Sequence, residues 1–319
     1  MKNLEIIPFK TEDSEIWDSN IELSSNYIFM GSRKFLSYHK TRFVDRSLSV
    51  FLDGVWIASF PVAEDPNNST YLISYPGATF GGLYFKKELR GEEHSSVFKE
   101  ILKYYKKLGY KKLKVRPIPS FYREHPIEDD FYALSSNGAL IDFCRPTCTV
   151  SLQGWGNLQL TKGRKSSRNK SLNAGVEIFE GWEWLEAFWM TLEENLKINH
   201  HATPVHTLDE IKTLIDRFRD SMVLYVGVKD SKVLAGALCF LHKRVVHTQY
   251  MSNTPTGREL SVLDAVINHA ISKSKEGGFA FFDFGTSQKN DGLIDESLYF
   301  YKQSFGAGSF CQWSFQFQL

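Results

Sequence analysis

The sequence predicts an α+β fold of two similar domains, each a mixed, mainly antiparallel sheet flanked by helices. The chain has 319 residues, which exceeds the length at which one hydrophobic core usually stops growing. Both halves show the same order of strands, loop, helix and strand, and their turn and helix-end residues keep matching separations of about 28 residues. We therefore expect domains at residues 1–155 and 156–319, with the last strand able to pack back on the first domain.

The first half contains two β-forming runs followed by a loop and a helix. An alternating run over 49–58 turns at Asp53-Gly54, and a second run covers 70–74. A glycine-rich loop over 76–82 indicates turn geometry, because no lysine follows it as in a phosphate-binding P-loop. Apolar residues at helical spacing predict a helix over 95–108, which Gly109 ends. Strands at 112–116 and 148–152 complete this half.

The second half repeats that plan after a basic segment over 162–173 and an aromatic helix over 182–196. We expect strands over 222–228, 233–241 and 245–252, a loop over 254–259, and a helix over 260–274 that stops at Gly277-Gly278. Strands over 280–284 and 311–319 follow. No low-complexity linker separates the halves.

Composition excludes several classes of function. The 38 Lys and Arg residues balance the 37 Asp and Glu residues, so no overall charge draws the chain to nucleic acid or to an anionic membrane. No segment has the length of apolar residues that a signal peptide or membrane helix needs, which predicts a cytoplasmic protein without membrane insertion. The four cysteines form no CxxC pair, and we expect them to be small buried residues. No metal is expected, because neither HExxH nor zinc-finger spacing occurs.

Two segments are candidates for binding phosphate. Backbone N–H groups at the start of a helix attract anions, which points to Gly257, Arg258, Leu260 and Ser261. Glu259 would repel an anion there, and a surface loop that caps a helix is the alternative. In the basic segment, Arg164, Lys165 and Arg168 can engage phosphate oxygens, and Arg164 and Arg168 share a face if the segment is helical. Solvated surface charges are the alternative.

The order of several motifs resembles the Fem-like acyltransferases of the GNAT fold, a bacterial family. These are the strand–loop–helix around Gly257, Arg168-Asn169, Pro204-Val205-His206, the first-half stretch from Tyr75 to Leu83, Phe281-Phe282-Asp283-Phe284-Gly285, and Tyr301-Lys302-Gln303-Ser304-Phe305-Gly306-Ala307. The resemblance covers most of the chain. The loop departs from the usual GNAT phosphate loop at Thr254 and Glu259.

The resemblance implies two tandem GNAT-like domains and an N-acyltransferase with one working site. The acyl group would come from acyl-CoA or a similar donor, with no tightly bound cofactor, and the loop at 254–259 would hold the CoA pyrophosphate. The acceptor would be an amine of a nucleotide-linked sugar or a cell-envelope precursor. The alternatives are tRNA-dependent aminoacyl transfer, which the near-neutral charge disfavours, and a catalytically silent binding module.

The resemblance also assigns roles to individual residues. Lys302 would act in transfer by stabilising the oxyanion, and Tyr301 would protonate the leaving group. Asp283 lies among phenylalanines, where a lone carboxylate needs partners, and would orient the substrate amine or cap the following turn. His206, His247 and Tyr250 would lie at the acceptor site. A surface lysine and a hydrogen-bonded sheet histidine are the alternatives for Lys302 and His247.

Overall fold

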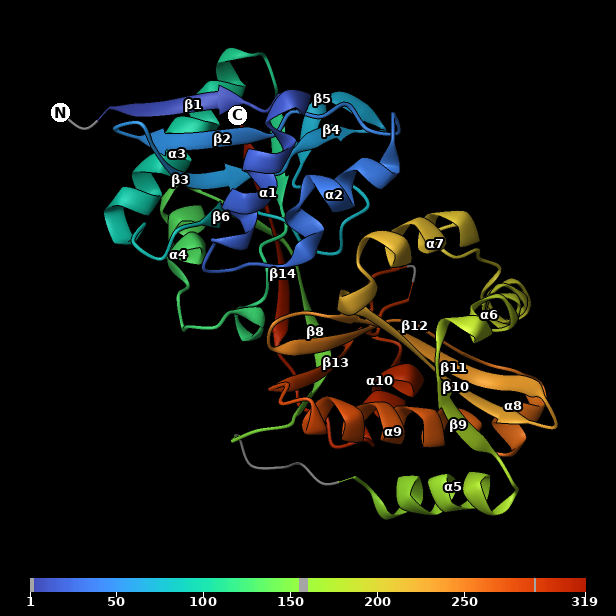
Figure 1. Ribbon diagram of the computed structural model, residues 1–319. Coiled ribbons are helices and arrows are strands. Elements are labelled where there is room, and N and C mark those ends of the chain that lie inside the picture. The colour runs from blue at the N-terminus through green and yellow to red at the C-terminus, as the bar shows by residue number, and fades with distance from the viewer. Residues whose placement is uncertain (1–2, 155–159, 290) are drawn as a thin grey trace. The chain divides into compact units, whose positions relative to one another are not determined.

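The computed structural model describes residues 3–154, 160–289 and 291–319, which form two compact units (Figure 1). The first unit comprises residues 1–145 and 311–319, and the second comprises residues 146–310. The domain boundary expected at 155 lies outside the described residues. The contacts instead divide the chain at Arg145, and its last strand belongs to the first unit.

The first unit contains eight complete strands, four helices and the start of β8 among its described residues. They are β1 (Leu4–Pro8), α1 (Ser14–Glu22), α2 (Arg33–Leu36), β2 (Leu48–Leu52), β3 (Val55–Phe60), β4 (Ala63–Asp65), β5 (Asn68–Ile73), β6 (Tyr84–Phe85), α3 (Gly91–Lys107), β7 (Lys112–Val115), α4 (Asp129–Ser136), the start of β8 (Leu140–Ser151), and β14 (Cys311–Gln318).

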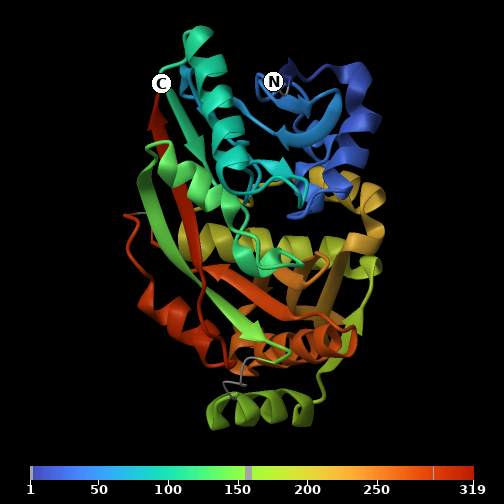
Figure 2. The ribbon, with the colours of Figure 1, turned by 90° about the vertical axis from the view of Figure 1, so that its left-hand side faces the viewer.

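Helix α3 supplies much of the core of this unit. It presents Val97, Phe98, Ile101 and Tyr105 to the sheet strands, where all four side chains are buried. This is the face that its helical spacing predicts. Helices α3 and α4 pack side by side (Figure 2). The neighbouring strands run in the orders β1-β2-β3-β6 and β4-β5-β7-β14.

The second unit contains one sheet in the order β8-β13-β12-β11-β10-β9. Its elements are α5 (Lys162–Asn173), β9 (Glu177–Glu180), α6 (Leu185–His200), α7 (Leu208–Arg217), β10 (Met222–Lys229), β11 (Lys232–Leu241), β12 (Val245–Asn253), α8 (Pro255–Glu259), α9 (Val262–Glu276), β13 (Phe281–Thr286) and α10 (Glu296–Gln303).

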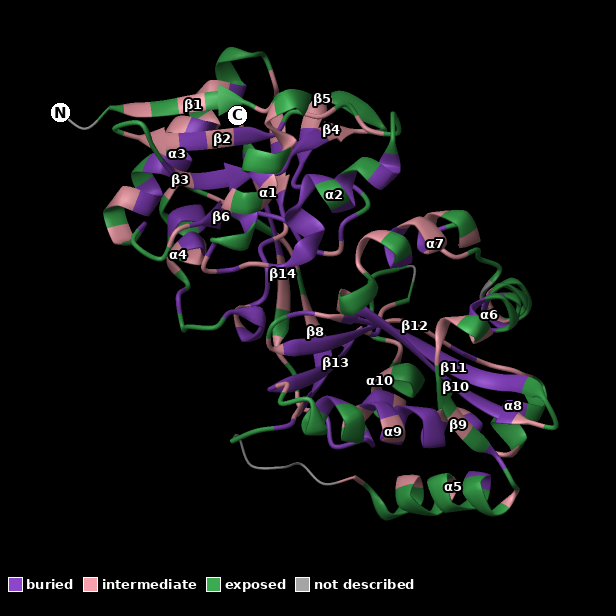
Figure 3. Ribbon diagram, in the orientation of Figure 1, coloured by how far each residue is buried: buried purple, intermediate pink, exposed green. Residues whose placement is uncertain are grey.

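Helices cover both faces of this sheet. A side chain at Gly227 would collide with Val262 of α9, and one at Gly236 would collide with Phe188 of α6, so the two helices lie on opposite faces. Strands β10, β11 and β12 are buried over most of their length, as Figure 3 shows. Helix α5 packs on α9 and remains largely exposed. Helix α5 therefore adds a further layer on the α9 side of the sheet.

Each unit contains a parallel pair of strands joined by a helix. In the first unit β5 pairs with β7 across α3, and in the second unit β12 pairs with β13 across α9. Each pair is then completed by an antiparallel strand from the other half of the sequence, since β14 pairs with β7 and β8 pairs with β13. The expected fold class, with mixed and mainly antiparallel sheets, is confirmed.

Several predicted segments differ from the structure. The expected loop over 254–259 contains the short helix α8, so α9 begins at Val262 rather than at Leu260. Strand β8 begins at Leu140, eight residues before the expected start, because it continues from one unit into the other. Two cysteines, Cys148 and Cys239, are buried as expected, whereas Cys144 and Cys311 are exposed. None of the helices in the described part of the chain could cross a membrane.

Candidate functional site

Strands β12 and β13 diverge at a histidine and an aspartate. Their parallel pairing runs from Val245 and Phe281 to His247 and Asp283, and it ends there. Beyond this point β12 contains an irregularity opposite Leu238 and Cys239, which leaves one extra residue, Gln249, between its paired neighbours. Bulges of this kind are common next to active sites, because they redirect a strand and its side chains.

Asp283 has no exposed surface and is held by three hydrogen bonds. One carboxylate oxygen accepts from His247 Nδ1 at 2.8 Å, and the other accepts from the Thr149 hydroxyl at 2.9 Å and the Gly285 N–H at 3.0 Å. Burial raises the pKa of Asp283, but the hydrogen bond and charge of His247 and the other two donors outweigh it and lower the pKa. Asp283 is therefore an ionised positioning residue for His247.

His247 is oriented by this carboxylate. When Nδ1–H donates to Asp283, the neutral ring carries its lone pair on Nε2, which can accept a proton. A side chain at Gly285 would approach the His247 ring to 3.2 Å, so the glycine leaves room for the imidazole. The nearby His242 is buried, and its pKa is lowered to about 3, first by burial and then by the charge of His247. His242 is therefore neutral at physiological pH.

Lys302 is buried in the same unit. It belongs to α10, retains 3% of its accessible surface, and donates from Nζ to the Thr286 carbonyl oxygen at 2.6 Å. Burial lowers the pKa of Lys302, while Cys148, Asp283 and Asp295 act in the opposite direction. Lys302 is thus an interior amine near the Asp283 carboxylate, not a surface lysine. A buried amine with a perturbed pKa and a nearby carboxylate is typical of functional sites.

Tyr301 faces a second carboxylate. Its hydroxyl donates to Asp264 at 3.1 Å, and the other oxygen of Asp264 binds Arg164 at 2.6 Å. Burial and the Asp264 charge raise the pKa of Tyr301 well above its usual value, so the phenol keeps its proton. The Arg164 guanidinium also donates to the Ser304 hydroxyl at 2.6 Å and lies 4.4 Å from the Tyr301 ring centre. Arg164 therefore joins α5 to α9 and α10.

The four positions predicted to bind the CoA pyrophosphate have their amide protons bonded within the chain. Gly257 N–H donates to the Thr254 hydroxyl, and Arg258 N–H donates to the Thr254 carbonyl. Leu260 and Ser261 bond to the carbonyls of Thr256 and Arg258. The side chain of Arg258 is bound by Asn253 and Asn195. As folded, the amides of these four positions are not free to bind a pyrophosphate, and the assignment of these positions stays a prediction.

The remaining predicted residues lie elsewhere in the second unit. Arg168 is exposed on α5 and contacts the Asn169 side chain. Although Arg164 and Arg168 belong to the same helix, only Arg164 of the two binds a carboxylate among the described residues. His206 Nδ1 and the Tyr250 hydroxyl lie 2.7 Å apart, and Tyr250 packs edge-on against Trp189. This pair holds the segment before α7 against β12. The structure gives no evidence that it binds an acceptor.

Sequence reasoning missed three partners of these residues: Thr149, His242 and Asp264. Each is polar and buried. Asp264 lies between Leu263 and Ala265 in the apolar face of α9, which is the one signal that would have identified it. Among the described residues, no group of three or more His, Cys, Asp or Glu side chains is placed to hold a metal ion.

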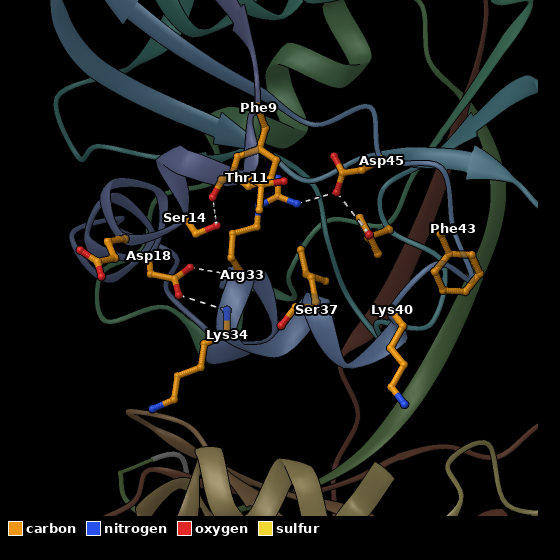
Figure 4. Close-up of a pocket in the computed structure, with 13 residues that line it drawn as sticks. Phe9, Thr11, Ser14, Asp18, Arg33, Lys34, Ser37, Lys40, Phe43 and Asp45 are labelled. Atoms are coloured by element: carbon orange, nitrogen blue, oxygen red, sulfur yellow. Dashed lines mark hydrogen bonds and ion pairs between the residues drawn. The ribbon is translucent and has the colours of Figure 1, made fainter.

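The first unit has a separate cavity, also absent from the sequence predictions. It has a volume of about 410 Å³, and Lys34 and Lys40 extend from one side of it (Figure 4). Arg33 pairs with Asp45 at 2.5 Å, and its guanidinium lies 3.4 and 4.0 Å from the ring centres of Phe9 and Trp17. The lining includes Glu15, Asp18 and Asp45 as well as three cations, so its charges balance.

Comparisons with known proteins agree with this architecture. Residues 164–303 match the family described as "Acetyltransferase (GNAT) domain". The solved structure of FemX has 12% identity and a TM-score of 0.69, covering 99% of this chain and 97% of FemX. A tandem GNAT protein from the clavulanic acid biosynthesis pathway has 9% identity and a TM-score of 0.58, with 99% and 98% coverage.

A third structure is similar over nearly the whole chain. It is the C-terminal domain of a putative lysylphosphatidylglycerol synthetase from Agrobacterium fabrum, with 12% identity, a TM-score of 0.63, and coverage of 96% of this chain and 92% of that domain. At these identities the likeness shows the fold. No curated protein matches the sequence.

Proposed function

We propose that this chain, an acyltransferase of the GNAT class with a Fem-like tandem fold, transfers an acyl group from an activated donor to an amine. The observation that carries the proposal is the buried His247–Asp283 pair, with Lys302 in the same polar cluster, where β12 and β13 diverge. The proposed acceptor is a nucleotide-linked sugar or a cell-envelope precursor. The fold shared with a lysylphosphatidylglycerol synthetase domain supports an envelope acceptor.

The chemistry needs a base and a cation. An amine attacks the donor carbonyl only after losing a proton, and His247 Nε2 would accept that proton with Asp283 holding the ring. The new N–C bond forms as the bond to the donor's leaving group breaks. Lys302 has protons beyond the one it gives to Thr286, and one of these would stabilise the oxyanion. Its assignment as a catalytic residue is part of the proposal.

Replacing Lys302 tests this role. Lys302→Met keeps much of the apolar stem and removes the charge, so turnover should fall about 100- to 1000-fold, or roughly 2.7–4 kcal/mol. The melting temperature should be maintained or rise, because burying an amine is costly. Lys273→Met, on the exposed surface of α9, is the control and should leave turnover unchanged. A Lys302→Met variant that folds normally and keeps more than about a third of wild-type turnover would rule out the role.

The donor is a separate question, and the closed turn at Thr254–Ser261 favours a second candidate. Because the amides of Gly257, Arg258, Leu260 and Ser261 are already bonded, an aminoacyl ester carried on tRNA, as the Fem resemblance implies, competes with acyl-CoA as the donor. Turnover assays with acyl-CoA and with aminoacyl-tRNA, each paired with amino-sugar nucleotides, distinguish the two. Transfer from acyl-CoA alone would require the turn to open and would contradict the aminoacyl donor.

A further inference from the structure

The second unit has a pocket between α5 and α9 that none of the predicted catalytic residues lines. Its volume is about 410 Å³, and its wall includes the last residues of β8 and Phe305. Helix α5 lies against α9 on the side away from the sheet in both ribbon views (Figures 1 and 2). The pocket adjoins the second half of α9, at Asn268 to Lys275, whereas the predicted pyrophosphate turn precedes the start of that helix.

The charges of this pocket have one sign. Lys165, Arg168 and Lys275 line it, and no carboxylate is among its lining residues in the described chain. Neither lysine side chain forms an ion pair or hydrogen bond with a described residue, and the Arg168 guanidinium bonds to the neutral Asn169 side chain. Glu276, the carboxylate next to Lys275 in sequence, is paired with Lys273 at 3.0 Å. The first-unit cavity differs, because its cations are matched by carboxylates.

Two other basic residues of α5 hold the wall in place. Arg164 binds Asp264, and Lys170 Nζ donates to the Glu259 carbonyl at 2.6 Å. The helix is therefore fixed to its neighbours by two cations while two others, Lys165 and Arg168, face the pocket. The alternative, a uniformly solvated basic helix, does not account for this division of roles.

We propose that this pocket binds the phosphate group of a small organic phosphate. Three cations that line one pocket match a dianion better than a monocarboxylate, which one cation would neutralise. Asn268 lines the same wall, and its amide donates one proton to the Asp264 carbonyl and keeps a second for a ligand. The hydroxyls of Ser151 and Ser272 already donate to the carbonyls of Gln153 and Asn268, so the cations supply the donors for the phosphate. Leu152, Ile271 and Phe305 form an apolar part for the rest of the ligand. A pocket of this volume fits a small molecule, whereas RNA would need an extended basic surface.

Direct binding to the full chain tests the proposal without requiring turnover, so its result is independent of the proposed activity. Isothermal titration with pyrophosphate and with uridine diphosphate should show saturable binding that weakens with salt. Arg168→Glu should raise both dissociation constants by at least about tenfold. Lys162→Glu makes the same charge change on α5 at an exposed residue outside the pocket and should leave binding unchanged.

Four results would overturn the assignment. The first is an absence of binding by both probes, and the second is equal weakening by Lys162→Glu. The third is succinate binding as tight as pyrophosphate binding, and the fourth is binding of a short single-stranded RNA that is tighter than that of either small probe. If Arg168→Glu fails to fold, the variant Lys165→Gln with Lys275→Gln removes two of the cations with little change in size. The same tenfold loss is then expected from that variant.

Discussion

At the scale of single residues, burial decides which polar groups can take part in chemistry. Asp283 is ionised although fully buried, because three donors compensate for its lost hydration. Lys302 has one carbonyl partner, and burial lowers its pKa. His242 is held neutral by burial. These environments assign the neighbouring groups different roles at the same pH.

His242 predicts how stability depends on pH. Its folded pKa is about 3 and its unfolded value is 6.5, so the unfolded chain binds an extra proton between these limits. Its contribution to stability is present above pH 6.5 and is lost as the pH falls toward 3, with a slope of up to about 1.4 kcal/mol per pH unit. His242→Gln should flatten this slope in urea denaturation between pH 6.5 and 4.

The control is His201→Asn, an exposed site in the same unit whose backbone has φ of 49°, a conformation that asparagine tolerates. It should keep the wild-type slope. An unchanged slope in His242→Gln would show that His242 does not control the acid sensitivity of this unit.

At the scale of elements, α5 is attached to its neighbours by polar side-chain contacts rather than by an apolar face. It buries one residue, Ser171, and its attachment to α9 rests on Arg164, with Lys170 at the other end. Arg164 contacts Asp264, Ser304 and the Tyr301 ring, so one side chain connects three helices or their ends. A polar helix of this length would not be stable alone.

Arg164→Ala should therefore release α5. The loss should be about 2–3 kcal/mol, because Asp264 remains buried without its cation. Chemical denaturation measures the change, and amide hydrogen exchange should rise across residues 162–173. Lys162→Ala, on the same helix but exposed, should cost less than about 0.5 kcal/mol. Equal losses of stability in the two variants would show that the Arg164 contacts do not hold the helix.

At the scale of the whole molecule, each unit is completed by a strand from the other half of the sequence. Strand β14 pairs with β7 and places Phe315 and Phe317 in the core of the first unit, although it follows the last helix of the second unit. Strand β8 continues from the first unit into the second, where it pairs with β13. The chain therefore crosses between the units twice.

Removing residues 311–319 should destabilise the first unit selectively. Its sheet loses the partner of β7 and two buried phenylalanines, so hydrogen exchange should increase at residues 112–115. Strands β10, β11 and β12 do not pair with β14, so their amides should stay protected from hydrogen exchange. Deletion of Leu319 alone is the control, because it leaves the β14 strand intact. Equal loss of protection in both units would contradict this division.

The sequence by itself determined the fold class and most elements of the second unit. Alternating and helical apolar spacing placed β10, β11, β12 and α9 within a few residues of their observed ends, because those patterns reflect burial along one segment. It also identified Asp283 as unusual, since a carboxylate next to several aromatics needs a partner, whereas Lys302 was singled out by the family resemblance.

Only the tertiary structure decided which partner each charge has. The Asp283–His247 contact joins residues 36 apart, and the Arg164–Asp264 contact joins residues 100 apart. No local pattern encodes such pairs. For the same reason the sequence treated Arg164 and Arg168 as equivalent, whereas packing against α9 partly buries Arg164 against a carboxylate and leaves Arg168 exposed at a pocket. Charge spacing gives the face of a helix, and the neighbouring helix determines what that face contacts.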